Sequence, residues 1–230
     1  MVTTDVQLFE TQDGSHSVLS GRYGVSYHSR YGAIRESMHV FIEAGLRLRG
    51  FAKDDLAVFE MGLGTGLNAL LTWLEARAHG WKVRYAAVET DPLPLEVVDQ
   101  LNYADTLGKP EAQGFLRRIH ESPWGAPIQF DKDRFTFSKV RKSLEEVHLP
   151  DSEYDVVYFD AFAPDVQPEL WTEDIFCKLW LAMAPGGVLT TYSAKGAVRR
   201  ALKAAGFEVE KLPGPPGKRE MTLARKPAAI

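Results

Sequence analysis

The sequence predicts an α/β protein built on a doubly wound, mostly parallel sheet. From residue 56 onward, short apolar runs typical of buried strands alternate with segments of helical apolar spacing. A glycine-rich turn joins the first of these runs to the first helical segment, as in sheets that bind nucleotide-like ligands. The chain has 230 residues, of which 45% are hydrophobic and 25% charged, values that fit a globular protein with one main domain.

The first part of the chain predicts a small extension (residues 1–50) ahead of the main domain (residues 51–230). Asp13-Gly14 separates two short apolar runs, a pattern typical of a β-hairpin. Apolar residues at helical spacing follow over residues 33–50. We therefore expect a hairpin and then a helix before the sheet of the main domain begins.

The main domain is expected to continue as alternating strands and helices. Strands are predicted at residues 56–61, 83–88, 134–137, 155–160 and 187–192, and helices at 67–78, from 93, at 171–183 and at 194–206. The region before residue 134 resembles a loop, and residues 207–211 and 219–224 predict a final antiparallel pair. Ligands bind such sheets at the carboxyl ends of the strands, which places the chemistry at residues 61–67, 89–91, 160–164 and 193.

The glycine turn after the first strand is the first motif that points to a ligand. Its glycines, Gly62, Gly64 and Gly66, lie where a helix N-terminus favours a negatively charged group. The dinucleotide fingerprint needs a third glycine at position 67, which is Leu67, so an NAD dehydrogenase is excluded. The spacing suits S-adenosylmethionine, which has a carboxylate and a ribose but no pyrophosphate.

Two acids follow the next strands at the same edge of the sheet. Glu89 ends the second strand about 20 residues beyond the glycines, where a carboxylate accepts hydrogen bonds from both ribose hydroxyls of an adenosine. Asp160 follows four apolar residues and emerges beside the expected cofactor, with Phe162 two residues later. An alkyl ammonium must lose a proton before its nitrogen attacks a methyl sulfonium, and Asp160 is placed to hold the amine and accept that proton. An Asp that merely caps the following loop is the alternative.

Charge is distributed unevenly along the chain, although its formal net value is only −4. Residues 151–174 carry eight acids and no Lys or Arg, whereas residues 195–226 carry nine bases against three acids, a net +6. A local basic surface is what phosphate contact requires, and an ordinary solvated face is the alternative interpretation.

Several classes of protein and site are excluded. No apolar run reaches the roughly 18 residues of a membrane span, and the N-terminus lacks the pattern of a signal peptide, so a cytoplasmic protein is expected. The single cysteine, Cys177, forms no internal disulfide, and we expect it in the middle of a helix, buried in the protein core. The histidines show no metal-ligand spacing, so no metal site is predicted. The sequence carries no signal of oligomeric state.

Five stretches, taken in order, resemble the methyltransferase unit of MnmC-type enzymes, which also occurs alone as MnmD. They are YHSRYGAIRESMHVFIEAGL (27–46), MGLGTGLN (61–68), DAFAPDVQPELW (160–171), YSAKGAVRRAL (192–202) and GKREM (217–221). The resemblance implies a class I Rossmann-like methyltransferase fold with residues 1–50 on the substrate side. It also implies methylation by S-adenosylmethionine of the 5-aminomethyl group on the wobble (2-thio)uridine of tRNA.

The resemblance implies roles for individual residues. Asp160 is the implied catalytic carboxylate, facing the aminomethyl group. The residues implied to bind the cofactor are Glu60, Gly62, Gly64, Gly66, Asn68, Glu89, Thr90, Asp160 and Phe162. Those implied on the substrate side are Tyr27, Glu36, Pro164, Trp171, Ser193, Arg199, Arg200, Lys218 and Arg219, with the arginines meeting tRNA phosphates.

The chain departs from the family in two respects. The family often has an acid after the third strand, at the adenine amino group, where this chain has Lys139, so we assign no residue to adenine. The chain also has no room for an FAD-dependent oxidase, so a separate source of the aminomethyl substrate is expected. Two other functions stay open: an aminopropyltransferase of the spermidine synthase kind, and a non-catalytic RNA-binding scaffold with a vestigial pocket.

Overall fold

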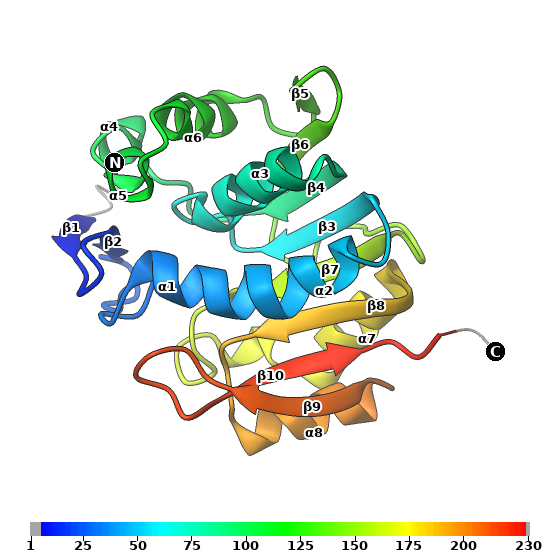
Figure 1. Ribbon diagram of the computed structural model, residues 1–230. Coiled ribbons are helices and arrows are strands. Elements are labelled where there is room, and N and C mark those ends of the chain that lie inside the picture. The colour runs from blue at the N-terminus through cyan, green and yellow to red at the C-terminus, as the bar shows by residue number, and fades with distance from the viewer. Residues whose placement is uncertain (1–5, 229–230) are drawn as a thin grey trace.

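The computed structural model describes residues 6–228 and places one large sheet between two layers of helices (Figure 1). Its strands are β3 (Asp55–Met61), β4 (Lys82–Val88), β5 (Ile128–Phe130), β6 (Phe135–Val140), β7 (Tyr154–Phe159), β8 (Met183–Thr191), β9 (Glu208–Pro213) and β10 (Glu220–Arg225). They lie in the order β5-β6-β4-β3-β7-β8-β10-β9. The strands from β6 to β8 are parallel, while β5, and β10 with its neighbour β9, run antiparallel to the strands beside them. The mostly parallel sheet with an antiparallel C-terminal pair is confirmed.

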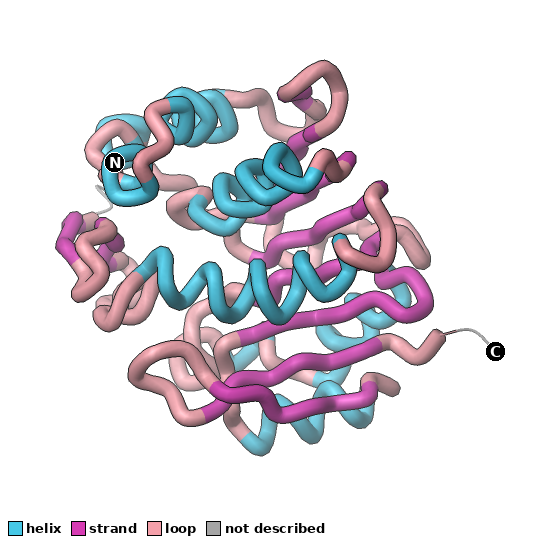
Figure 2. Tube along the Cα trace, viewed as in Figure 1, coloured by secondary structure: helices cyan, strands magenta, loops and turns pink. Residues whose placement is uncertain are grey.

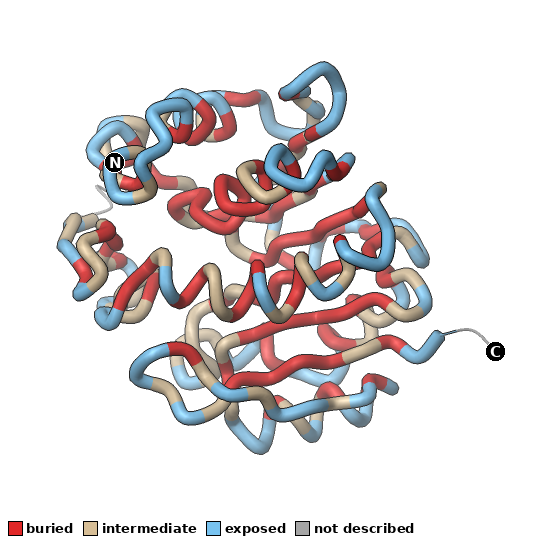
Figure 3. Tube along the Cα trace, in the orientation of Figure 1, coloured by how far each residue is buried: buried red, intermediate tan, exposed pale blue. Residues whose placement is uncertain are grey.

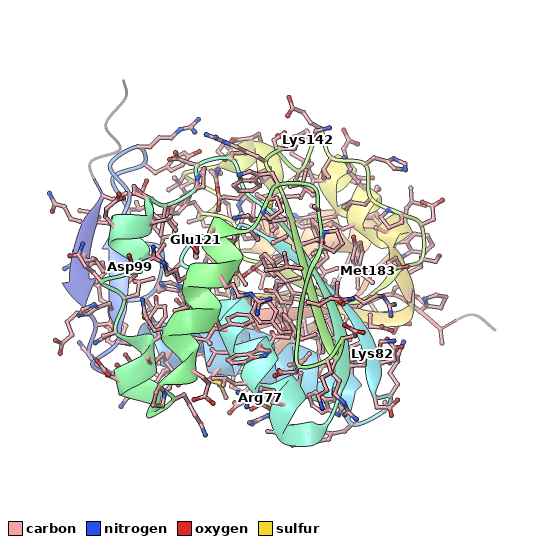
Figure 4. All side chains as sticks on the ribbon, turned by 90° about the horizontal axis from the view of Figure 1, so that it is seen from above. Arg77, Lys82, Asp99, Glu121, Lys142 and Met183 are labelled. Carbon is pink, nitrogen blue, oxygen red and sulfur yellow. The ribbon has the colours of Figure 1, made fainter. Side chains whose placement is uncertain are left out.

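Helices cover both faces of the sheet (Figure 2). The helical segments are α1 (Ala33–Ser37), the π-helix η1 (Met38–Arg47), α2 (Leu48–Gly50), α3 (Leu67–His79), α4 (Leu95–Val98), α5 (Tyr103–Leu107), α6 (Glu111–Glu121), the 3-10 helix η2 (Pro168–Leu170), α7 (Glu173–Ala182) and α8 (Gly196–Ala204). Viewed from above, Arg77 on α3 and Lys142 after β6 lie on opposite sides of the molecule (Figure 4).

The core follows the alternation of the strands. In β3, Leu56 and Val58 join the layer that contains η1, α3 and α6, while Ala57 and Phe59 join the layer that contains α7 and α8. Both faces are apolar because both are covered, which is why the central strands read as continuous apolar runs. Figure 3 shows these strands as the most continuously buried part of the chain.

The extension begins with an antiparallel hairpin, β1 (Gln7–Glu10) and β2 (His16–Leu19), as the Asp13-Gly14 pattern predicts. Figure 1 shows this hairpin beside the carboxyl ends of the parallel strands, where α1 also begins. The helical segment after it is confirmed, but residues 38–47 are wound as a π-helix, which no apolar spacing indicated. Phe41, Ile42 and Leu46 bury the segment against the sheet and α3.

Three expectations about the elements are wrong. The region before residue 134 is not loop-like, because it contains α5, α6 and β5; α6 buries Ala112, Phe115, Leu116 and Ile119 at helical spacing. Trp171 precedes α7, since Thr172 caps that helix by accepting a hydrogen bond from the backbone N–H of Ile175. Cys177 is partly exposed rather than in the core, because it borders a groove on the outer side of α7.

Candidate active site

A cavity of about 310 Å³ opens at the carboxyl ends of β3, β4 and β7. Its wall is made by the loops that follow these strands, by residues 23–29 of the extension, and by Glu36, Tyr192 and Lys218. We call it the inner cavity. The loops predicted to carry the chemistry at residues 61–67, 89–91 and 160–164 contribute to it, whereas Ser193 lies in a neighbouring groove.

The glycine turn forms the floor of the inner cavity beside the N-terminus of α3. Gly62, Gly64 and Gly66 all have positive φ, at 87°, 51° and 78°, a conformation that side chains rarely adopt. A Cβ on Gly62 would lie 3.1 Å from the backbone oxygen of Asp160, so the turn packs directly against the loop after β7. Gly66 faces α6 instead of the cavity and shapes the turn from behind.

Glu89 ties the glycine turn to the loop after β4. One carboxylate oxygen accepts a hydrogen bond from the backbone N–H of Gly64 at 2.9 Å. The other accepts from the N–H groups of Thr90 and Asp91 at 2.7 and 2.8 Å. The carboxylate thus borders the cavity in a fixed position, as a group that accepts ribose hydroxyls requires.

Asp160 also borders the inner cavity and shares an amide with a second acid. The side-chain amide of Asn68 donates to Asp160 at 2.8 Å and to Glu60 at 2.9 Å. The pKa of Asp160 is raised to about 7, chiefly by burial and secondly by the charge of Glu36. The hydrogen bond from Asn68 and the charge of Lys218 act in the opposite direction. Asp160 is therefore a stronger base than an exposed carboxylate.

Glu60 is fully buried behind Asn68 and does not border the inner cavity. Burial raises its pKa well above the ordinary value, and the hydrogen bond from Asn68 acts in the opposite direction. The structure therefore places Glu60 where it orients Asn68. It is not in a position to touch a ligand.

Glu36 and Lys218 form an ion pair that joins the extension to the loop between β9 and β10. Lys218 Nζ lies 2.7 Å from Glu36 Oε1, while the other oxygen of Glu36 accepts a hydrogen bond from the backbone N–H of Ser29 at 2.7 Å. Lys218 Nζ also lies 3.8 Å from the centroid of the Tyr192 ring. The hydroxyl of Tyr192 donates to the backbone oxygen of Ala161 at 2.8 Å, which fixes the ring.

Aromatic rings form the side of the inner cavity that the extension covers. The Phe162 ring contacts those of Tyr23 and Tyr27, with centroids 4.8 and 5.2 Å apart. Gln167 holds this wall by accepting from the backbone N–H of Phe162 and donating to the hydroxyl of Tyr23. Trp171 does not border the cavity; it is buried behind the wall and donates to the backbone oxygen of Phe162.

A second, wider groove of about 590 Å³ adjoins the inner cavity. We call it the outer groove; its lining residues are Ala163, Pro164, Tyr192, Ser193, Ala194, Lys195, Lys218, Arg219 and Glu220. It gathers four of the residues predicted on the substrate side: Pro164, Ser193, Lys218 and Arg219. Ala163, Tyr192 and Lys218 border both spaces, so they form the partition between them.

The basic C-terminal segment is less available than its +6 charge suggests. Arg199 is held by Glu220 at 2.8 Å and donates to the hydroxyl of Thr222 and the backbone oxygen of Met221. Lys226 is buried and donates to two backbone oxygens, and Lys195 pairs with Asp165. Within residues 6–228, Arg200, Lys203 and Arg219 are exposed bases of this segment for which no ion pair is found.

Some residues of the site escaped the sequence analysis. Tyr192 and Gln167 lie one residue before and three residues after predicted positions, so their signal was proximity to a strand end. Tyr23 belongs to a turn whose contacts only the fold reveals. Lys142 borders the cavity, while Lys139 points away from it and donates to the backbone oxygen of His120.

His28 also borders the cavity. It is buried beside the hydroxyl of Ser17, with 3.0 Å between Nδ1 and Oγ. Burial lowers the pKa of His28 to about 4, so the imidazole is neutral at physiological pH. Its place in the wall comes from packing, and no charge is brought to the cavity by this residue.

Comparison with known proteins identifies relatives along most of the chain. The bifunctional protein MnmC of Ralstonia nicotianae, named for tRNA 5-methylaminomethyl-2-thiouridine biosynthesis, is 33% identical over 220 residues. The match covers 90% of this chain and 33% of that protein. The protein of the same name from Aromatoleum aromaticum is 32% identical over 226 residues, which are 94% of this chain and 34% of the relative. The chain thus spans about a third of the length of these relatives.

The fold has a close counterpart among solved structures. The crystal structure of MNMC2 from Aquifex aeolicus superposes with a TM-score of 0.79 at 23% identity, over 100% of this chain and 73% of the other. This match shows that the fold is that of a class I methyltransferase with an N-terminal hairpin, as expected.

The cavity itself fits S-adenosylmethionine. Its floor is a glycine turn at a helix N-terminus, and a carboxylate stands at the position that a ribose requires. Asn68 Oδ1 is a buried acceptor with no hydrogen-bond partner within the described residues, next to the cavity that the residue lines. A family model described as S-adenosyl-L-methionine-dependent methyltransferase matches residues 112–227, half of the chain. The chain belongs to this family of S-adenosyl-L-methionine-dependent methyltransferases.

Proposed function

We propose that the chain methylates the nitrogen of the 5-aminomethyl group on the wobble (2-thio)uridine of tRNA, giving 5-methylaminomethyl-(2-thio)uridine. One observation carries the proposal. A carboxylate of raised pKa, Asp160, lines the same cavity as the glycine turn, and a groove of about 590 Å³ adjoins this cavity. The names of the MnmC relatives supply the class of acceptor, and an amine is the acceptor that this carboxylate suits.

The residues that line the inner cavity would bind the cofactor and activate the acceptor amine. Gly62, Gly64, Asn68 and Glu89 would hold S-adenosylmethionine in the inner cavity, and when bound this cofactor supplies a methyl group on a positively charged sulfur. Asp160 would hold the acceptor amine and take up one of its protons, which frees the nitrogen lone pair for the methyl carbon. The sulfonium is already activated, so alignment of the amine contributes more than the strength of the base.

The outer groove is where we place the nucleotide. Its rim carries Arg219, and the exposed Arg200 lies on the neighbouring helix α8. Both are positioned to contact phosphates, whereas Arg199 is already engaged by Glu220 and would act by holding β10 in place. Charge reversal at Arg200 and Arg219 should therefore weaken tRNA binding and reduce its salt dependence. Reversal at Arg199 should instead lower stability.

Mass spectrometry of the wobble nucleoside tests the function directly. The protein is incubated with S-adenosylmethionine and tRNA that carries 5-aminomethyluridine; the expected product is heavier by one methyl group. Asp160→Asn serves as the control for contaminating activity. A parallel reaction with decarboxylated S-adenosylmethionine and a diamine tests for an aminopropyltransferase. A product there, with unchanged tRNA, would overturn the proposal.

Over residues 6–228, no helix has both the length and the apolar character that a membrane crossing demands. The proposal that tRNA is the partner rests on the groove, the exposed bases and the relatives.

A further inference from the structure

The partition between the inner cavity and the outer groove contains a cation of the protein itself. Lys218 Nζ lies 2.7 Å from Glu36 Oε1 and 3.8 Å from the centre of the Tyr192 ring. We infer that this is the subsite for the substrate's ammonium group, and that Lys218 occupies it until the substrate displaces the lysine. The inference rests on the proposed function and specifies how the amine is recognised.

The chemistry of the subsite matches an alkyl ammonium. The lysine head group and a protonated aminomethyl group are both primary ammonium ions on a methylene carbon. Glu36 offers a carboxylate of low exposure, Tyr192 offers the face of an aromatic ring, and the charge of Asp160 acts on the same region. A set of groups that holds one primary ammonium will hold another.

Displacement of the Lys218 side chain would open a passage between the two spaces. Lys218 borders both spaces together with Ala163 and Tyr192. Ala163 is too small to move out of the way, and Tyr192 is fixed by its hydrogen bond to Ala161. Lys218 is the member of the partition with a long flexible side chain, which is 34% exposed. Its departure would join the outer groove to the cavity that holds Asp160.

The exchange preserves the charge of the site. Without a cation, the negative charge of Glu36 would act on Asp160 unopposed and raise the cost of ionising it. An incoming ammonium replaces the lysine with the same charge, while the lysine head moves into the outer groove. The backbone of the loop stays in place, because Gly217 is packed against the ring of Tyr31.

A small ammonium ion tests the subsite without tRNA. Ethylammonium chloride is added to wild type and to Lys218→Met, and the shift in melting temperature is compared with that from potassium chloride at equal ionic strength. Because the variant leaves Glu36 without its cation, we expect ethylammonium to bind it at least 10-fold more tightly than wild type. The preference should disappear in the double variant Glu36→Gln/Lys218→Met. Equal binding to wild type and Lys218→Met would overturn the inference.

The control is Lys211→Met, which removes the same charge from an exposed lysine of β9. Kinetics with aminomethyluridine tRNA complete the test. We expect KM to fall about 3-fold in Lys218→Met and not in Lys211→Met. A rise in KM with a weaker salt dependence would make Lys218 a phosphate contact and overturn the inference. Selective ethylammonium binding without any methylation of tRNA by wild type would keep the subsite and overturn the proposed acceptor.

A neutral competitor separates charge recognition from fit. tRNA bearing 5-hydroxymethyluridine has a hydroxyl in place of the ammonium and fills the same space. Wild type should prefer the aminomethyl form about 10-fold, and Glu36→Gln should reduce that preference to about 2-fold. An unchanged preference in Glu36→Gln would show that the ammonium binds elsewhere.

Discussion

Asp155 and Asp160 stand at opposite ends of the same strand, β7, and their surroundings differ sharply. Asp155 accepts hydrogen bonds from Lys53 Nζ at 3.0 Å and from the backbone N–H of Ala57 at 2.9 Å, with Arg49 Nη2 a further 3.8 Å away. Asp160 receives one side-chain hydrogen bond, from Asn68, and faces the negative charge of Glu36. One carboxylate is matched by cations and the other is opposed by an acid.

The difference supports the proposal that the carboxyl-terminal edge of the sheet carries the function. The cations and the backbone N–H around Asp155 give that carboxylate a structural role. A carboxylate kept from its partners has a raised pKa and is costly to ionise, as groups that transfer protons often are. Two acids that look alike in the sequence are therefore distinguished by what the neighbouring strands place around them.

The largest effect is expected on turnover, from Asp160→Asn. The amide keeps the shape and a bond to Asn68 but cannot accept a proton, so the rate should fall about 10²- to 10⁴-fold. Affinity for S-adenosylmethionine, measured by calorimetry, should change little. Asp155→Asn is the matched control, and its folded fraction should turn over at the wild-type rate. A normal rate in Asp160→Asn would contradict the assigned role.

A smaller effect, on stability, is expected from Asp155→Ala. The change removes a carboxylate with only 4% of its side chain exposed, and it leaves the N–H of Ala57 without this acceptor. Lys53 is 44% exposed, so its charge stays hydrated when the carboxylate is removed. The free energy of unfolding should therefore fall by about 2 kcal/mol, which is less than the cost of leaving a fully buried charge without a partner. Urea unfolding measures it, and a loss below 0.5 kcal/mol would show that the pairing contributes little.

Asp160→Asn should also stabilise the fold, in a manner that depends on pH. The pKa of Asp160 is about 7 in the folded protein and near 3.8 when unfolded, so ionisation destabilises the native state as pH rises from 4 to 7. The ceiling of this cost is about 4 kcal/mol, and water in the cavity reduces it. We expect a gain of about 2 kcal/mol at pH 8 and almost none at pH 4, measured by denaturant unfolding at both values. A gain that is equal at both would exclude ionisation as its cause.

The sequence predicted the central parallel strands of the sheet better than the elements at its edges. Central strands such as β7 are buried on both faces, and their continuous apolar runs mark both their extent and the residue at which they end. Asp160 and Glu89 were found for that reason. The residues around them come from distant parts of the chain: Glu36 lies in the extension and Lys218 in the last loop, and resemblance, not periodicity, pointed to both.

Other features left no usable signal or a misleading one. The apolar spacing of α6 was present but short and flanked by charged residues. The π-helical winding of η1 left no mark in the apolar spacing, and the close packing of Gly45 against Tyr158 and Thr190 is a tertiary contact that the sequence does not show. A count of charges could not reveal that Arg199 is paired with Glu220, because this pairing depends on how β10 and α8 lie relative to each other in the fold.

The smallest expected effect is on the pH dependence of kcat/KM, which reports ionisations of the free enzyme. The rate should rise with pH through a midpoint near 7, where Asp160 loses its proton. The charge of Glu36 raises the pKa of Asp160 and that of Lys218 lowers it. Glu36→Gln should therefore move the midpoint down and Lys218→Met should move it up, each by less than about one pH unit. Shifts in the same direction would mean that the midpoint belongs to another group, because a group that interacts with both charges must respond to their removal with opposite signs.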